Sequence, residues 1–495
     1  MKTWKLISWL AILIWVAVGI YGIFYNLTYV DEAKYLIKGW LITTGKVGYY
    51  STKSFFYQHM PGGLLWYGLG QKFLGPNLIL ARIQSFVLGL LILGASFLTA
   101  KKLFSEKAGV IALALLSLTP IVTLYYSSAV PQSLAALMLG LGFLSLVKEK
   151  RWWATVWFSL SFISREQFIF TLVIYLVWLF RFYRKEFLKH LVVSLIILTA
   201  FMGPGMPRIL NVIKNFPGIN TLMPISQVEK EILSLHWQQQ THGFKLYFRA
   251  IKEFGVIYFI WFLAGVVSFW KSKRLKIKKS LKLTWLLLVV IFIFNFLAHG
   301  VAAFQISPRA IVSYFGYTAP MAAVIVGGLL SKKIKDRQAL KIYLLALLLV
   351  PISMIYSSIF TKPDGENVIN EVNRSAEVIK DLAEGKEKIV WLAEPMSLYL
   401  AGRISYYPLI NHTNLYKPLD ETETIRDLGF WNQEIMAGWL KEADMVVWND
   451  NRLKLLNQNP DTKHFPAWFE KEIGGWKEIE INYDIWPRNL RFVEK

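Results

Sequence analysis

Long apolar stretches alternate with short polar or charged segments along the first 360 residues of the chain. Stretches such as Phe187–Met202, Gly255–Trp270 and Leu283–Ala298 are close to the length that an α-helix needs to cross about 30 Å of hydrocarbon. A backbone in lipid must satisfy its own hydrogen bonds, so these runs predict helices and not buried strands. The predicted spans are 5–25, 77–100, 108–125, 131–147, 152–165, 167–181, 187–204, 255–270, 281–299, 308–330 and 339–359.

The net charge of +22 is concentrated in every second loop between these spans. Together with the N-terminus, these loops hold 24 Lys and Arg residues and only four acidic residues. This alternation follows the positive-inside rule, so the basicity indicates topology and excludes nucleic acid as a partner. About eleven spans then leave the N-terminus in the cytoplasm and the C-terminus outside. The first apolar run resembles a signal peptide, but it continues to Tyr25 without a small-residue cleavage site, which favours an uncleaved helix.

Three predicted outer segments are longer than simple connectors: 26–76, 203–254 and 361–495. In the first, helical patterns cover Asp31–Trp40 and Gly62–Leu74. The fold class is therefore a polytopic α-helical membrane protein of the plasma membrane, with a catalytic module at 1–360 that includes the outer loops 26–76 and 203–254. The chain has no Cys, so it has neither a disulfide framework nor a thiolate metal site.

The tail from residue 361 changes character, because it carries 17 basic and 23 acidic residues. Strand patterns at Lys388–Ala393 and Asp444–Trp448 are mixed with helical patterns, which predicts a partly parallel sheet. We expect residues 361–495 to form a small soluble α/β domain on the outer face. The predicted helices are Glu371–Glu384, Met396–Tyr399 and Trp431–Lys441.

Three arginines lie in or beside spans near the outer surface, against the positive-inside pattern: Arg82, Arg165 (followed by Glu166) and Arg309. Charged groups at such positions are costly, so something there requires them. A phosphate at headgroup depth fits, because a guanidinium binds phosphate through two parallel hydrogen bonds. The arginines could instead extend to lipid phosphates or pair with Glu166.

Asp31 and Glu32 follow the first span directly. Asp31 could cap a helix that starts at Glu32. Equally, the pair could supply a general base that removes a proton from an acceptor hydroxyl.

The order of short motifs along the chain resembles that of the GT-C membrane glycosyltransferases, in particular the protein O-mannosyltransferase and lipid A aminoarabinose transferase superfamily. The motifs that carry the resemblance are Asp31-Glu32-Ala33-x-Tyr35, Gly39 and Gly45 with Tyr49–Tyr50, His59-Met60-Pro61-Gly62-Gly63, Leu74-Gly75-Pro76, Ala81–Ser85, Ser164-Arg165-Glu166 and Arg309 through Pro320. The resemblance spans nearly the whole chain. The turn at His59 has one proline where the family often has two.

The resemblance implies transfer of a hexosyl or pentosyl group from a polyprenyl-phosphate donor to an extracytoplasmic acceptor, which is a protein, a lipid or a glycan. It implies Asp31 as general base with Glu32 beside it, and donor-phosphate binding by Arg82, Arg165 and Arg309. Many relatives have a second acid before span four, whereas this chain has Gln132, which weakens schemes that need two carboxylates or a metal. The sequence therefore specifies no cofactor, and a divalent metal ion stays open.

Further candidates for substrate binding are the polar side chains of the outer segments and span ends. These are Tyr50, His59, Gln132, Glu166, His236 and His242. The spacing of the histidines is not diagnostic of a metal site, and solvated or structural roles stay open for them. Two other functions also stay open: a transporter or flippase, which should show charge at the membrane midplane and an internal repeat, and a non-catalytic membrane assembly protein.

Overall fold

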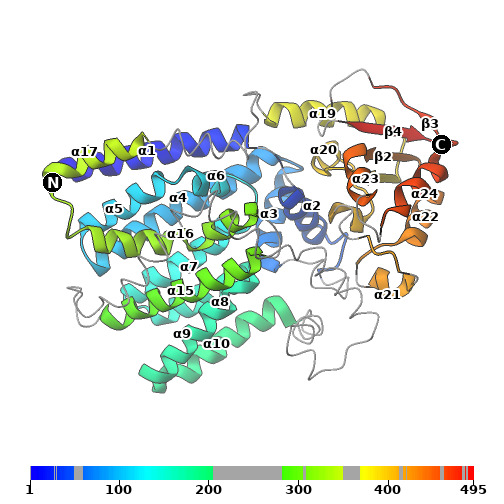
Figure 1. Cartoon of the computed structure of the whole chain (residues 1–495). Coiled ribbons are helices and arrows are strands. Elements are labelled where there is room, and N and C mark those ends of the chain that lie inside the picture. The colour runs from blue at the N-terminus through cyan, green and yellow to red at the C-terminus, as the bar shows by residue number, and fades with distance from the viewer. Residues whose placement is uncertain are drawn as a thin grey trace.

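The computed structural model describes residues 2–26, 28, 30–49, 60–203, 281–304, 308–348, 368–411, 416–419, 421–427, 429–457, 462–481, 485 and 489–495. A bundle of helices forms one part of the molecule, and a small sheet covered by helices forms the other (Figure 1). Two helices, α2 (Val30–Thr43) and α3 (Pro61–Leu74), lie between these parts.

Helices occupy nine of the eleven predicted spans and the first part, 339–347, of the span predicted at 339–359, whereas the predicted span 255–270 lies outside the described residues. The bundle consists of α1 (Lys2–Tyr25), α4 (Leu78–Leu103), α5 (Glu106–Ser117), α6 (Pro120–Tyr126), α7 (Gln132–Val147), α8 (Arg151–Ser164), α9 (Ile169–Phe182), α10 (Arg184–Met202), α15 (Lys282–Phe304), α16 (Pro308–Leu330) and α17 (Asp336–Leu347). Among the described helices, α1 and α4 have the length and apolar composition to cross a membrane. Four shorter segments are also apolar, and the number of spans stays a prediction.

One predicted span is broken into two helices. The single span predicted at 108–125 consists of α5 and α6, with Leu118 and Thr119 between them. Thr119 precedes Pro120, and a residue before proline avoids the α conformation. The break turns α6 toward the outer segments, so that Leu124 and Ser128 contact Asn26 at the end of α1.

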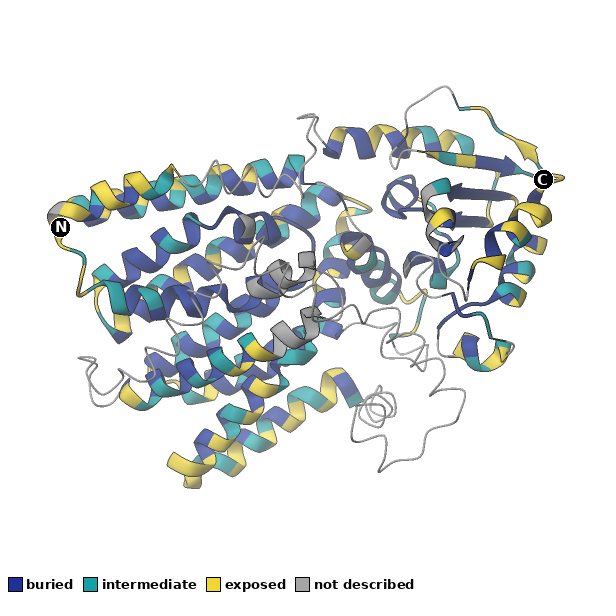
Figure 2. Ribbon diagram, viewed as in Figure 1, coloured by how far each residue is buried: buried dark blue, intermediate teal, exposed yellow. Residues whose placement is uncertain are grey.

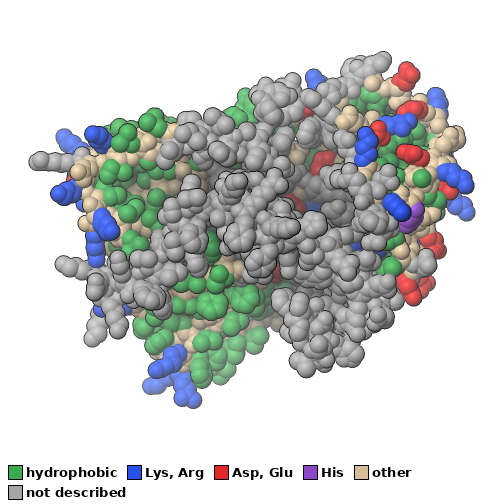
Figure 3. Space-filling view, in the orientation of Figure 1, with side chains coloured by type: hydrophobic (Ala, Val, Ile, Leu, Met, Phe, Trp, Pro, Cys, Tyr) green, Lys and Arg blue, Asp and Glu red, His purple; other side chains and the backbone are tan. Residues whose placement is uncertain are grey.

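Basic side chains gather at the end of the bundle that lies away from the sheet (Figure 3). Asp336 at the start of α17 joins three elements there, because it accepts a hydrogen bond from Trp4 and pairs with Lys107. Arg151 and Glu186 connect the starts of α8 and α10 in the same way. The basic loops predicted to be cytoplasmic therefore include pairs of loops that lie in direct contact.

Helices α2 and α3 cross at two glycines. A Cβ atom on Gly39 would lie 2.3 Å from the carbonyl oxygen of Leu64, and one on Gly68 would lie 2.2 Å from the carbonyl oxygen of Gly39. Thr43 adds a hydrogen bond of 3.0 Å from its hydroxyl to the Gly68 carbonyl. Any larger residue at either glycine would force the two helices apart, so the crossing fixes the position of α2.

The C-terminal part contains a four-stranded sheet of order β1-β2-β4-β3. Strand β1 (Ile389–Leu392) pairs in parallel with β2 (Met445–Asn449), whereas β4 (Leu490–Glu494) pairs antiparallel with β2 and with β3 (Lys477–Glu478). Strands β1 and β2 are fully buried, as a sheet with helices on both faces requires (Figure 2). The surrounding helices are α19 (Val368–Leu382), α20 (Met396–Leu400), η6 (Tyr407–Asn411), α21 (Thr422–Asp427), α22 (Gln433–Glu442), α23 (Asp450–Asn457) and α24 (His464–Ile473).

The helices beside the sheet share a core with the outer helices of the bundle. Leu36 of α2 and Leu64 of α3 pack in one cluster with Ile369 of α19 and Met396 of α20. The ring of Tyr399 lies 6.1 Å from that of Trp40, in an edge-on arrangement. The division of the chain into 1–360 and 361–495 stays a prediction. The shared core shows that α19 and α20, which follow residue 361, pack directly on α2 and α3.

Candidate active site between the bundle and the sheet

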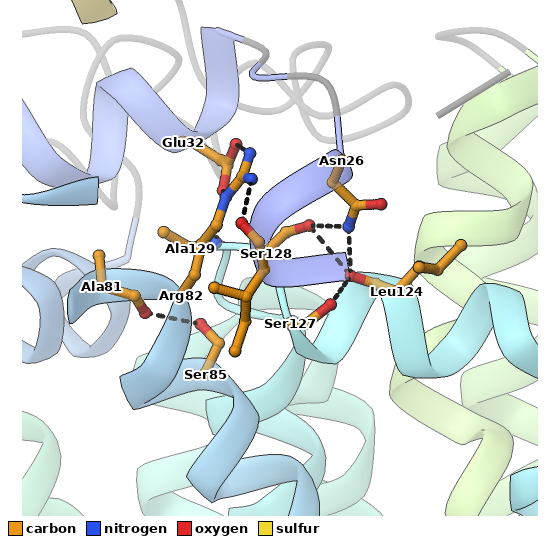
Figure 4. Close-up of polar contacts among 10 residues, drawn as sticks. Asn26, Glu32, Ala81, Arg82, Ser85, Leu124, Ser127, Ser128 and Ala129 are labelled. Atoms are coloured by element: carbon orange, nitrogen blue, oxygen red, sulfur yellow. Dashed lines mark hydrogen bonds and ion pairs between the residues drawn. The ribbon is translucent and has the colours of Figure 1, made fainter. Parts of the chain in front are cut away.

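Glu32 and Arg82 form an ion pair with no exposure to solvent. The Nε and Nη2 atoms of Arg82 donate to the two carboxylate oxygens of Glu32 over 2.9 and 2.7 Å, and Nη1 donates to the carbonyl of Ile23 over 2.7 Å. Figure 4 shows Arg82 extending from α4 to reach Glu32 at the start of α2. All three nitrogens of this guanidinium therefore have partners within the protein.

The same carboxylate also holds the turn between α6 and α7. The backbone N–H of Ala129 donates to Glu32 over 2.8 Å. Beside it, Asn26 donates from Nδ2 to the Leu124 carbonyl and to the Ser128 hydroxyl (Figure 4). Glu32 thus connects the start of α2 to α4 and to this turn, and a buried charge with this many partners is a positioning element.

Asp31 is adjacent in sequence but lies in a different environment. Its side chain is 53% exposed and accepts a hydrogen bond of 3.1 Å from Lys34, one turn along α2. The helix begins at Val30, so Asp31 lies in its first turn and the expectation that it is the N-cap is wrong. A carboxylate in the first turn still interacts favourably with the helix dipole. Of the two adjacent acids, Asp31 is the one that reaches solvent.

Tyr35 is a buried hydroxyl around which several predicted site residues gather. Burial raises the pKa of Tyr35 well above its ordinary value, the charge on Arg165 opposes this, and Tyr317, Asp31 and Glu166 add to it. These groups must lie within electrostatic reach of one hydroxyl. The structure therefore brings Asp31, Arg165 and Glu166 to one region, although they come from α2 and from the segment after α8.

Arg165 lies at the end of α8, where the backbone becomes extended. Its guanidinium carbon is 5.8 Å from the ring centre of Tyr317 on α16, within the range of a cation–π contact. Its Nε is 3.6 Å from a carboxylate oxygen of Glu166, so the pairing of these two residues that the sequence left open is present. The distance is that of an ion pair and is too long for a hydrogen bond.

The proline and glycine motif after residue 59 packs against these residues. A Cβ atom on Gly62 would lie 2.7 Å from the hydroxyl oxygen of Ser164. One on Gly63 would lie 3.1 Å from both Pro131 and the ring of Tyr35. The start of α3 therefore approaches α2, α7 and the end of α8 closely, and only glycines permit this approach.

Of the remaining predicted site residues, the structure describes some and leaves others outside the described residues. Gln132 is the first residue of α7 and is buried, with 8% exposure. Arg309 is the second residue of α16, and its side chain is not described. Outside the described residues lie Tyr50, His59, His236 and His242. The part of the chain that the structure describes has no group of three or more His, Cys, Asp or Glu residues that could hold a metal ion.

Sequence reasoning missed Lys34, Lys38, Tyr35 and Tyr317. Lys34 and Lys38 follow Asp31 at helical spacings of three and seven, so the sequence carried a signal that they share its face. Lys38 is buried, its ammonium lies 5.5 Å from the ring centre of Tyr407, and burial holds its pKa well below the ordinary value. Tyr35 belongs to the motif that begins at Asp31, and Tyr317 lies in the motif segment from Arg309 through Pro320, but neither tyrosine was given a role.

Solved structures with the same arrangement include ArnT from Cupriavidus metallidurans bound to undecaprenyl phosphate. The identity is 12%, the TM-score is 0.56, and the match covers 99% of this chain and 97% of that one. The chain has the GT-C glycosyltransferase fold. The oligosaccharyltransferase of Archaeoglobus fulgidus has it too, with 13% identity and a TM-score of 0.55 over 97% of this chain and 75% of that one. The predicted resemblance to GT-C enzymes, which are polytopic membrane proteins, is confirmed.

The family model for dolichyl-phosphate-mannose-protein mannosyltransferases matches residues 58–205 of this chain. That region includes Arg82, Gln132 and Arg165. A further structure, the oligosaccharyltransferase AglB of Archaeoglobus fulgidus in complex with an inhibitory peptide and a dolichol-phosphate, is 11% identical with a TM-score of 0.52, over 97% of this chain and 76% of that one. No curated protein sequence matches the chain.

Proposed function

We propose that the protein transfers a sugar from a polyprenyl-phosphate donor to a hydroxyl group of an extracytoplasmic acceptor. The mannosyltransferase family model supports a glycosyltransferase. ArnT was solved with undecaprenyl phosphate and AglB with a dolichol-phosphate and a peptide, which supports a polyprenyl-phosphate donor and a separate acceptor. The sugar, hexosyl or pentosyl, and the acceptor, a protein, lipid or glycan, are not specified by these similarities.

The observation that carries the proposal is the different solvent exposure of the two adjacent carboxylates, Asp31 and Glu32. Glu32 is buried and bound by Arg82 and Ala129, whereas Asp31 reaches solvent, and both Asp31 and Arg165 act electrostatically on the Tyr35 hydroxyl. Asp31 is therefore the general base, and Glu32 fixes the helix that presents it. Such a base contributes about 10²- to 10⁴-fold to the rate of a reaction of this kind.

In the reaction, Asp31 accepts the proton of the acceptor hydroxyl as its oxygen attacks the anomeric carbon of the sugar. The bond between that carbon and the phosphate oxygen breaks, and the electron pair leaves with the polyprenyl phosphate. Arg165 and Arg309 stabilise the negative charge on the leaving phosphate. Each nitrogen of the buried Arg82 guanidinium already donates to Glu32 or Ile23, which favours a positioning role for it over the phosphate contact expected from the sequence.

The orientation is part of the proposal. Helix α2, which carries Asp31, and the C-terminal sheet lie toward one end of the bundle, and basic side chains gather at the other (Figures 1 and 3). If the basic end is cytoplasmic, then Asp31, the loops 26–76 and 203–254 and the tail 361–495 face the outside of the plasma membrane.

The test is the replacement Asp31→Asn, assayed with a radiolabelled polyprenyl-phosphate sugar and the purified full-length protein. We expect kcat to fall by about 10²-fold or more, with donor binding changed less than about threefold, because the amide cannot accept the proton. Asp336→Asn is the matched control, since Asp336 is also an exposed aspartate paired with a lysine, at the opposite end of the bundle. Equal activity of Asp31→Asn and wild type would eliminate the base assignment.

A further inference from the structure

Gln132 has a buried acceptor that no donor among the described residues satisfies. The residue is 8% exposed, and its side-chain oxygen Oε1 is shielded from solvent with no hydrogen-bond partner among the described residues. Burying a polar atom without a partner costs free energy, so such an atom in a candidate site marks a place where a ligand can supply the missing donor.

The same residue opens helix α7, whose N-terminus has no side-chain cap. Residue Pro131 stands at the N-cap position and offers no acceptor to the first-turn N–H groups of this 16-residue helix. These N–H groups carry partial positive charge and favour an oxygen atom nearby. Among the described residues, Oε1 of Gln132 therefore lacks a donor, and no N-cap side chain accepts from the first turn of α7.

The surroundings connect this point to the proposed reaction centre. Pro131 packs on Gly63 beside the ring of Tyr35. On the other side, the Gln132 Cγ atom is 4.0 Å from where a Cβ on Gly316 would be, and the next residue, Tyr317, holds the cation–π contact with Arg165. The Tyr126 hydroxyl donates to the Gly316 carbonyl and fixes α16 at this place.

The phosphate and the sugar of a polyprenyl-phosphate sugar differ in whether they can donate a hydrogen bond to Gln132 Oε1. The phosphate of such a donor is a diester with no O–H group, so it can accept from the helix N–H groups but cannot donate to Oε1. A sugar hydroxyl can do both at once. The sugar is also the group bonded directly to the phosphate that Arg165 is proposed to bind.

We propose that Gln132 and the N-terminus of α7 bind a hydroxyl group of the donor sugar, an inference that rests on the proposed function. Gln132 is then a sugar-recognition residue, at a position where many relatives of the resembled family have an acid. A neutral amide keeps this subsite free of negative charge beside the donor phosphate.

The test compares two lipids and two variants of the full-length protein in nanodiscs. The lipids are undecaprenyl phosphate alone and undecaprenyl phosphate carrying mannose, glucose or galactose, of which the tightest ligand of the wild type is used. The variants are Gln132→Leu and, as the matched control, Gln84→Leu. Gln84 on α4 also has a shielded Oε1 without a partner among the described residues, but it packs on Gly70 instead of near Tyr35.

We expect Gln132→Leu to raise the Kd of the sugar-bearing lipid roughly tenfold, as the loss of one hydrogen bond predicts. The Kd of bare undecaprenyl phosphate should stay unchanged, which also reports an intact fold, and Gln84→Leu should change neither. An equal change for both lipids, or none for the sugar-bearing lipid, would overturn the inference. Failure of the wild type to bind any of these lipids would instead overturn the proposed function.

Discussion

Two arginine–glutamate pairs of the same geometry lie at opposite ends of the bundle. Arg82 and Glu32 join α4 to α2 through two hydrogen bonds and are not exposed to solvent. Arg151 and Glu186 also make two hydrogen bonds, of 3.1 and 3.0 Å, but their side chains are 27% and 44% exposed. The buried pair stands beside the exposed Asp31, whereas the exposed pair belongs to the basic end that we assign to the cytoplasm.

The comparison separates two uses of charge in one membrane protein. At the basic end, charged side chains remain in contact with water and mark topology. At the outer end, burial makes Glu32 and Arg82 dependent on each other, because neither charge could remain there alone. The buried pair fixes the position of α2. This position matters because α2 carries the proposed base, Asp31.

The largest expected effect comes from breaking the buried pair. Glu32→Gln leaves the charge of Arg82 uncompensated, so we expect a loss of about 3–5 kcal/mol in the free energy of unfolding. Turnover should fall as well, because α2 loses its anchor. Thermal unfolding of the purified protein, followed by circular dichroism, measures the first effect. The double variant Glu32→Met with Arg82→Met should recover much of the stability, and a wild-type unfolding curve for Glu32→Gln would contradict the role given to the pair.

A smaller effect, on donor binding, is expected when Arg165 at the candidate site is compared with Arg151 at the basic end. Arg165→Ala should weaken binding of a polyprenyl-phosphate sugar by about 1.5–3 kcal/mol, the contribution of a hydrogen bond to a charged group. Arg151→Ala, at the other end, should leave the Kd unchanged. The measurement is the Kd of each variant for the same lipid, obtained by titration. Equal weakening would mean that the two ends do not differ as described.

The smallest effect is expected for the exposed pair. Glu186→Gln should cost at most about 1 kcal/mol of stability, because water and salt screen an ion pair at this exposure. The same unfolding measurement as for Glu32→Gln makes the two values directly comparable. A loss as large as that for Glu32→Gln would show that burial does not explain the difference between the pairs.

Much of the fold could be predicted because the membrane simplifies the problem. Apolar runs such as the one in α1 must be helices in lipid, and the helices α2 and α3 were placed within a few residues of their observed bounds. The strands β1 and β2 were also predicted from short β-branched runs. The break before Pro120 was missed, although the proline itself was the available signal.

The candidate site could be predicted only in part. Asp31, Arg165 and Glu166 were expected together, and all three act electrostatically on Tyr35. The pairing of Glu32 with Arg82 was not predicted, because the two residues are 50 positions apart and no local pattern connects them. The role expected for Arg82 depended on its having free donors, which only the three-dimensional contacts could decide.

The most direct test of the account is the position of the carrier phosphate in a structure of the protein with undecaprenyl phosphate bound. We predict that the phosphate lies at the outer end, within about 4 Å of the Arg165 guanidinium, as a charged hydrogen bond requires, and that the exposed carboxylate of Asp31 faces the same space. A phosphate bound at the basic end of the bundle, among residues such as Arg151, would contradict the account.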